Sequence, residues 1–197
     1  SLIQEHYLQV FFIGIMIVVA AAVKSAQLPF SSWLPRAMEG PTTSSAIFYG
    51  SLSVHLGVFL LLRTYPLWES ILAIKIGIIV VGLLSAIIAS GIAKVQSSVK
   101  TQIAYSSITQ IGLIFIEVAL GWHEVALIHF TANAFLRTYQ LLVCPSLLGY
   151  MIHDMFFNFM PKKQVVGNSF CSKLKNTVYI LSIKEWNLDV MLHRYLW

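Results

Sequence analysis

The sequence predicts an all-α membrane protein with about five transmembrane helices, the first of them discontinuous, followed by an interfacial C-terminal tail. Of the 197 residues, 57% are hydrophobic and only 11% are charged, whereas about a quarter of the residues are charged in ordinary soluble domains. Apolar runs of about the twenty residues needed to cross a bilayer recur along the chain. Most charged residues lie between or beyond these runs, so the bilayer is the expected solvent.

The predicted helices cover, in order, about residues 7–27, 44–62, 71–93, 102–120 and 124–151. In the first run, Gln9 is the one strongly polar residue before Lys24. The second run is bounded by Arg63 and the third by Lys94. Only residues 121–123 join the fourth and fifth runs, a connection short enough to make these two helices antiparallel neighbours.

Basic residues outside the runs predict the orientation in the membrane. If the loops alternate sides, one side carries most of them: Arg36, Lys94, Lys100, Lys162, Lys163, Lys173 and Lys175. Arg63 lies on the other side, so the positive-inside rule makes the first side cytoplasmic or matrix and places the N-terminus outside. The membrane surface therefore explains the net charge of +5, and we expect no nucleic-acid partner.

We expect residues 1–152 to form the transmembrane part and residues 153–197 a distinct tail. The tail mixes aromatic residues with most of the late charges, and its longest apolar stretch, 178–181, is far too short to span a membrane. An interfacial, partly helical tail fits this composition, with three aromatic residues at headgroup level: Trp186, Tyr195 and Trp197. A disordered or truncated end is the alternative.

The stretch SAQLPFSSWLPRAM follows Lys24 and predicts a broken helix. Pro29 and Pro35 interrupt the helix because proline lacks the backbone donor that a helix needs. The apolar residues around them would be poorly placed in water, so we expect helical structure to continue to about Met38 within the membrane. Lys24 would then lie beside the break, where discontinuous helices line cavities or binding sites. The alternative is a lysine near the end of its span whose aliphatic stem lets the ammonium group reach the interface.

The fifth predicted helix carries the densest set of polar residues. His129, Asn133 and Arg137 are spaced by four and therefore share one face of the helix. A neutral histidine can both donate and accept a proton, and asparagine can hold a bridging water, so this face suits a hydrogen-bonded proton relay. The alternative is that the three side chains hold packed helices together.

Two further titratable residues lie within predicted spans, His55 in the second and Glu117 near the end of the fourth. Either could be a proton site, and structural roles at a helix contact or at the interface are the alternatives. The sequence has no nucleotide-binding loop, no His-Glu-x-x-His motif and no nucleophile elbow. Cys144 and Cys171 lack metal-ligand spacing. We therefore expect no cofactor, no metal and no redox or hydrolytic centre in this chain.

Three stretches resemble motifs of one membrane protein family. KSAQLPFSSWLPRAMEGPTTSSAI, VQSSVKTQIAYSSITQIGLIF and ALIHFTANAFLRTYQLL are similar, in order and spacing, to motifs of the antiporter-like subunits of respiratory complex I, especially the fifth mitochondrial subunit and bacterial chain L. The resemblance implies a long α-helical bundle built from two inverted five-helix repeats, of which this chain is a fragment covering about the seventh to eleventh helices. It also implies proton conduction in company with other membrane subunits.

The resemblance carries roles onto three matching positions. Lys24 matches the central lysine of the first broken helix, which is thought to hold and pass on a proton. Lys100 matches the lysine of the second motif, and His129 matches the first histidine of the eleventh helix.

Other positions depart from the family pattern. Tyr49 stands where the family usually has a histidine, with His55 six residues later, and Asn133 and Arg137 replace a second histidine and a lysine. Arginine is effectively always protonated, so Arg137 can position charge or water but does not readily relay a proton. The departures imply a divergent branch, related to subunits of cation/proton antiporters and of inorganic-carbon uptake systems.

The leading interpretation is a subunit that translocates protons or other ions, with a path that involves Lys24, Tyr49, His55, His129, Asn133 and Arg137. In complex I it would belong to an NADH:quinone oxidoreductase whose redox centres lie in other chains. The alternatives are a membrane subunit of a cation/proton antiporter or carbon-uptake system, and a scaffold that has lost conduction. We expect a bacterial inner membrane rather than a mitochondrial inner membrane as its location.

Overall fold

The protein is described by a computed structural model, which covers the backbone of residues 7–158, 170–188, 190–191 and 194 and the side chains of residues 7–144, 172–188, 190–191 and 194. This part of the chain contains helices and no strands. Its long helices are α2 (Tyr7–Lys24), α5 (Leu56–Trp68), α6 (Leu72–Ala93), α7 (Val99–Ala119) and α8 (His123–Asn158). The predicted all-α fold is confirmed.

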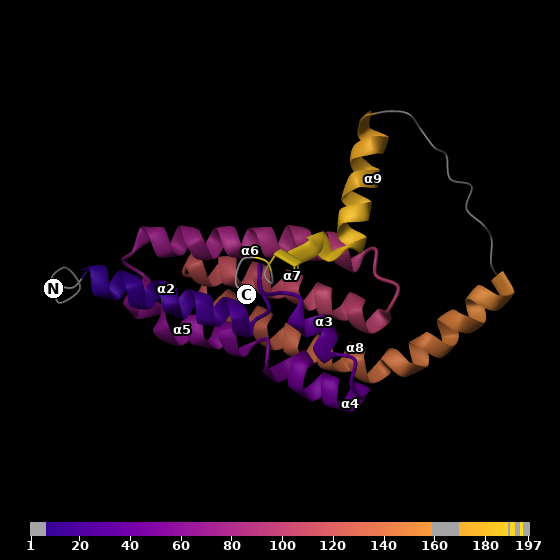
Figure 1. Ribbon diagram of the computed structural model, residues 1–197. Helices are drawn as coiled ribbons and strands as arrows, with labels where there is room; N and C mark the ends of the chain where they lie inside the picture. The colour runs from indigo at the N-terminus through magenta and orange to yellow at the C-terminus, as the bar shows by residue number, and fades with distance from the viewer. Residues whose placement is uncertain (1–6, 159–169, 189, 192–193, 195–197) are drawn as a thin grey trace.

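The long helices form an elongated bundle, from which the later part of α8 extends outward (Figure 1). Helix α6 packs along α7, α7 packs against α8, and α2 packs against α5. In the described residues, four helical segments are long and apolar enough to cross a membrane: 7–24, 42–68, 72–93 and 99–119. They match the first four predicted spans, and the fifth predicted span forms most of α8, a helix of 36 residues.

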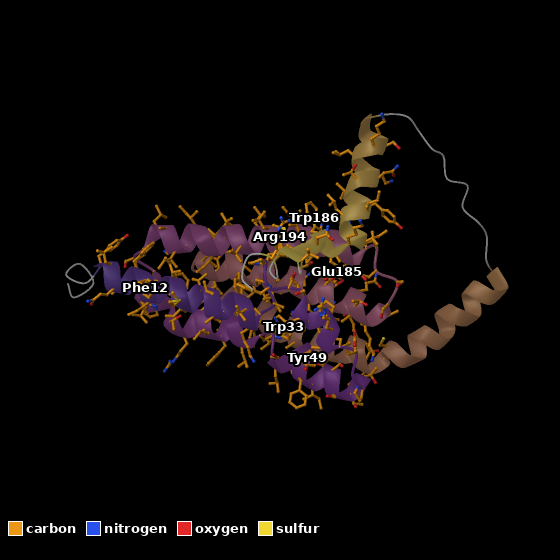
Figure 2. All side chains as sticks on the ribbon, viewed as in Figure 1. Phe12, Trp33, Tyr49, Glu185, Trp186 and Arg194 are labelled. Carbon is orange, nitrogen blue, oxygen red and sulfur yellow. The ribbon has the colours of Figure 1, made fainter. Side chains whose placement is uncertain are left out.

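Apolar side chains line both the inside and the outside of this bundle. The buried core includes Trp68 and Phe115, while other large apolar side chains such as Phe12 point away from it (Figure 2). Leu8 and Phe135 are each 79% exposed. A soluble monomer rarely exposes so much contiguous apolar surface, so this surface fits contact with lipid.

Two helix backbones approach each other closely where α6 meets α7. A Cβ atom on Gly82 would lie 2.5 Å from the Gly112 carbonyl oxygen, and one on Gly112 would lie 2.6 Å from the Gly82 carbonyl oxygen. The two backbones touch because neither residue has a side chain. Small residues at such contacts are typical of membrane helix packing.

The predicted break follows α2 directly. Ala26 adopts a left-handed backbone conformation with φ of 53°, the Leu28–Pro29 peptide bond is cis, and helical structure resumes in the short α3 (Trp33–Ala37). Pro29 thus lies in the break. Pro35, expected to interrupt the helix as well, instead lies buried in the first turn of α3, where the helix does not need the backbone N–H that proline lacks. The prediction that helical structure resumes and ends near Met38 is confirmed.

Hydrogen bonds between side chains and backbone groups tie this break to the neighbouring helices α6 and α7. The Leu28 amide donates to Ser85 Oγ of α6 at 3.0 Å, and Gln27 Nε2 donates to the Ile108 carbonyl of α7 at 3.3 Å. Buried backbone groups need such partners, above all in hydrocarbon. The break is therefore built into the bundle rather than placed in a loop outside it.

The second predicted span consists of three consecutive helical pieces. Helix α4 (Thr42–Ser45) continues as a π-helix, η1 (Ala46–Leu52), and α5 follows three residues later. A π-helix is rare and is frequently found at functional sites, because its wider turn changes the direction of the side chains that follow. Here it contains Tyr49 and ends three residues before His55.

The described part of the tail contains helix α9 (Phe170–Ile183), which stands away from the bundle in Figure 1, and a short turn, η2 (Glu185–Asn187). Trp186 packs against the core of the bundle, and Tyr195 and Trp197 lie outside the described residues. Helix α8 runs through residue 152 to Asn158, so the division of the chain at residue 152 stays a prediction.

Candidate functional site

Three buried polar side chains form a hydrogen-bonded network inside the bundle, which we call the buried polar network: His55, Asn133 and Arg137. His55 Nε2, from the start of α5, lies 3.1 Å from Asn133 Nδ2 on α8. Arg137, one turn further along α8, donates from Nε to Asn133 Oδ1 at 3.3 Å. His55 is 1% exposed, Asn133 4% and Arg137 6%. The spacing by four predicted that His129, Asn133 and Arg137 share a face. The fold adds His55 to Asn133 and Arg137, whereas His129 has other partners.

The donor and the acceptor of each hydrogen bond in this network can be assigned, starting from Arg137. Arg137 can only donate, so the Asn133 atom that faces it is the carbonyl oxygen and the amide nitrogen faces His55. The amide nitrogen is a donor, so His55 Nε2 accepts and the ring proton of a neutral His55 is on Nδ1. The His55 ring also packs edge-on against Phe130, with ring centroids 5.1 Å apart. This histidine is held in one orientation.

His129 belongs to a second polar cluster, between α7 and α8. Its Nδ1 lies 2.8 Å from Glu117 Oε1 and its Nε2 lies 2.9 Å from Gln110 Oε1. Both ring nitrogens face oxygen acceptors, an arrangement that suits a doubly protonated imidazolium beside a carboxylate. The second Glu117 oxygen, Oε2, is buried without a hydrogen-bond partner in the described residues. The cluster can therefore hold a proton between an imidazole and a carboxylate.

Lys24 lines a cavity of about 670 Å³ beside the helix break. Tyr49 of the π-helix and Trp33 of α3 line the same cavity, and their rings meet edge-on with centroids 6.3 Å apart (Figure 2). The Lys24 side chain itself is exposed. The structure thus brings Lys24 and Tyr49 to one cavity, at the end of α2 where the sequence places the lysine.

Close packing joins the wall of this cavity to the buried polar network. Ser25, directly after Lys24, donates from Oγ to the Val54 carbonyl at 2.6 Å. Val54 directly precedes His55, and a Cβ atom on Gly57 would overlap Ser25 Oγ. The break and the start of α5 are therefore in direct contact, which places the segment after Lys24 against the segment that carries His55.

Lys100 lies apart from these clusters. At the start of α7, its Nζ donates to the Gly40 carbonyl at 2.9 Å, and it lines a separate cavity of about 440 Å³ with Arg36, Glu39 and Glu185. Its position links α7 to the loop after α3.

Helix α7 carries further polar residues that were not among the predicted site residues. Gln102, Ser106 and Gln110 line a further cavity of about 270 Å³ together with Lys94 and Arg137. The signal was present in the sequence, since these three residues of α7 are spaced by four and share one face. They face the polar residues of α8, so the two helices present matching polar faces to each other.

Comparisons with known proteins agree with this architecture. Residues 2–167 match the family described as "NADH:quinone oxidoreductase/Mrp antiporter, TM". NADH-ubiquinone oxidoreductase chain 5 of Cryptococcus neoformans var. grubii is 38% identical over 143 residues, 73% of this chain and 21% of that relative. NADH-quinone oxidoreductase subunit L of Rhodobacter capsulatus is 36% identical over 142 residues, 72% of this chain and 20% of that relative.

A solved structure shows the same fold. A chain in the structure of the Mrp complex from a Dietzia species aligns with a TM-score of 0.65 and 29% sequence identity over 75% of this chain, which corresponds to 16% of the Dietzia chain. The present chain spans about a fifth of the length of the curated relatives it matches.

Proposed function

Because the chain belongs to the NADH:quinone oxidoreductase/Mrp antiporter family of membrane proteins, we propose that it is the ion-conducting part of a membrane subunit in a multisubunit complex. The observation that supports the proposal is the buried polar network, in which hydrogen bonds join His55 to Asn133 and Asn133 to Arg137. Polar groups are costly inside a bilayer and mark ion or proton paths when they face the interior of a bundle. The translocated species is a proton or a small cation.

In this proposal, Lys24 holds a proton at the cavity beside the break, and Tyr49 connects it through water to His55. Asn133 links His55 to Arg137 through hydrogen bonds. The fixed positive charge of Arg137 positions water and changes the energy of a proton on a neighbouring group. His129 and Glu117 form a second holding site on the same pair of helices. Each group reaches the next through side chains or through water in the cavities described above.

The curated relatives include chains of NADH-ubiquinone and NADH-quinone oxidoreductases, which favours a complex I type of assembly. In such an assembly, the redox chemistry would lie in other subunits, and this chain would need no cofactor of its own. A cation/proton antiporter is the alternative, favoured by the structural likeness to the Mrp complex. We place the protein in a bacterial inner membrane, a location that the relative from Rhodobacter capsulatus favours and the fungal relative does not.

One observation favours a scaffold without conduction. Asn133 and Arg137 do not readily release a proton, and they make up two of the three residues of the buried polar network. A scaffold would keep the packing of the helices but would tolerate the loss of Lys24.

The experiment that decides between conduction and scaffold uses the full-length subunit within its complex, in sealed membrane vesicles. We expect Lys24→Ala to reduce ion transport at least tenfold while the complex still assembles. Lys173→Ala, on the exposed surface of α9, is the matched control and should keep the wild-type rate. Unchanged transport in Lys24→Ala would contradict the proposal and favour the scaffold.

A further inference from the structure

Arg137 carries a buried positive charge that no acidic side chain balances in the described residues. It is 6% exposed, and its three hydrogen-bond partners are neutral. Nε donates to Asn133 Oδ1 at 3.3 Å, Nη1 to Gln140 Oε1 at 2.7 Å, and Nη2 to the Ser106 carbonyl at 3.1 Å. A buried charge is costly unless an opposite charge accompanies it.

The acidic residues closest to Arg137 along its own and the adjoining helix are out of reach. Glu117 pairs with His129 and lies on α7 eleven residues beyond Ser106, about 16 Å along the helix. On α8, Glu124 lies thirteen residues before Arg137 and Asp154 lies seventeen residues after it, about 20 Å and about 26 Å away along that helix. The guanidinium therefore has neutral partners within the bundle and needs its counter-charge from elsewhere.

A cavity of about 270 Å³ opens directly onto Arg137. Its lining residues include a second cation, Lys94, and include no carboxylate. Lys94 is exposed at the end of α6, on the side that the distribution of basic residues assigns to the cytoplasm or matrix. Both charged residues of the lining are thus positive, and of the two Lys94 is exposed whereas Arg137 is buried.

Several hydrogen-bond donors of this cavity remain free for a ligand. A guanidinium has five N–H groups, and Arg137 uses three of them in the contacts above. Gln110 uses its oxygen to face His129, which leaves its amide N–H groups as donors. The hydroxyl groups of Thr109 and Ser90 donate to backbone carbonyls instead. The free donors come from Arg137, Lys94 and the amide side chains of α7.

We propose that this cavity binds a small monovalent inorganic anion of about the size of chloride, which neutralises Arg137. One bound anion balances the one buried charge, and the donor set offers N–H groups without a competing carboxylate. The anion enters past Lys94, whose ammonium group attracts it from solution. This site goes beyond the proposed translocation of protons or cations, because it concerns an anion that stays bound as a structural counter-charge.

Halide binding by the full-length subunit that contains this chain, purified in lipid nanodiscs, tests the proposal. When chloride replaces gluconate at constant ionic strength, the thermal unfolding midpoint of the wild-type protein should rise, since a ligand that binds only the folded state stabilises it. Bromide should act like chloride. The chloride concentration that gives half of the shift measures the affinity.

Variants at the site and away from it make the test specific. Arg137→Gln should abolish the chloride-dependent shift, and Lys94→Gln should raise the half-maximal chloride concentration at least threefold. Asn133→Asp places a carboxylate beside Arg137 Nε and should also abolish the shift, although the arginine remains. Arg63→Gln, an exposed arginine at the other end of the bundle, is the control and should keep the wild-type shift.

The outcomes separate this proposal from its rivals. Equal midpoints in chloride and gluconate for the wild-type subunit overturn it, and this is the result expected if a carboxylate of a neighbouring subunit neutralises Arg137 instead. A wild-type shift that persists in Arg137→Gln and Asn133→Asp also overturns it. If Arg137→Gln does not fold, Asn133→Asp and the line width of ³⁵Cl NMR decide.

Halide binding requires no ion flux, so this proposal can fail or succeed apart from the proposed function. Lys24→Ala should lose transport yet keep the full chloride shift. Loss of transport without any chloride effect in the wild-type protein would contradict only the anion site, and a chloride effect without transport would contradict only the conduction proposal.

Discussion

His129 Nδ1 lies 2.8 Å from Glu117 Oε1 and so joins α8 to α7 through a partly buried imidazole–carboxylate contact. The contact lies near the end of α7 that adjoins the short turn to α8. It places a carboxylate beside His129, the histidine of α8 that matches the first histidine of the family motif. A carboxylate there can stabilise an imidazolium or take its proton.

Two substitutions at Glu117 separate its charge from its packing. Glu117→Gln keeps an oxygen acceptor for His129 and should fold normally, but ion transport by the complex should fall about tenfold because the negative charge is gone. Glu117→Ala also removes the acceptor and should lower the free energy of unfolding by about 1–3 kcal/mol. Vesicle transport assays and thermal unfolding check the two effects, and wild-type transport in Glu117→Gln would show that the carboxylate has no part in conduction.

Asn133→Ala should destabilise the bundle by about 1–3 kcal/mol, because it leaves His55 Nε2 and Arg137 Nε buried without their partner. Thr131→Ala is a control on the same helix. Thr131 is exposed and bonds only to carbonyls of its own helix, so its loss should change stability by less than about 0.5 kcal/mol. Thermal unfolding midpoints in detergent measure the stability of both variants. Equal midpoints for Asn133→Ala and Thr131→Ala would contradict a structural role for the buried polar network.

Gly57→Ala should destabilise the contact between α5 and the break by about 1–3 kcal/mol, since its Cβ atom would overlap Ser25 Oγ and the Ala21 carbonyl oxygen. Gly77→Ala in α6 is the matched control, because a Cβ atom there meets nothing within 4 Å. That control should gain up to about 1 kcal/mol from the higher helix propensity of alanine. Thermal unfolding distinguishes the two, and a Gly57→Ala protein as stable as wild type would contradict the described packing.

Tyr105→Phe should loosen the turn η2 from the bundle. The buried Tyr105 side chain of α7 is a hydrogen-bond partner of Glu185, and Trp186, which is labelled together with Glu185 in Figure 2, packs against the core. Without the hydroxyl group, trypsin should cleave after the exposed Lys184 several-fold faster. Tyr139→Phe, at an exposed position of α8, should leave the cleavage rate unchanged, and an equal rate in Tyr105→Phe would show that the hydrogen bond does not hold the turn.

The positions of the helices and of the break after the first one follow from local properties of the amino-acid sequence. Hydrocarbon requires about twenty consecutive apolar residues for a span, so composition alone places the runs that became α2, α6 and α7 to within a few residues. Proline cannot continue the hydrogen-bonding of a helix, which locates the break after Lys24. The spacing of Asn133 and Arg137 by four likewise predicts their shared face, because it depends only on the helix repeat.

The contacts between polar groups depend on how the helices pack in three dimensions. His55 and Asn133 are 78 residues apart in the chain, and their contact depends on how α5 and α8 are rotated about their axes and on the π-helix that turns the residues after it. The pairing of His129 with Glu117, the unbalanced charge of Arg137 and the exposure of Lys24 have the same origin. Hydropathy and spacing are local properties of a helix, whereas the partners of a side chain are set by the packing of several helices against one another.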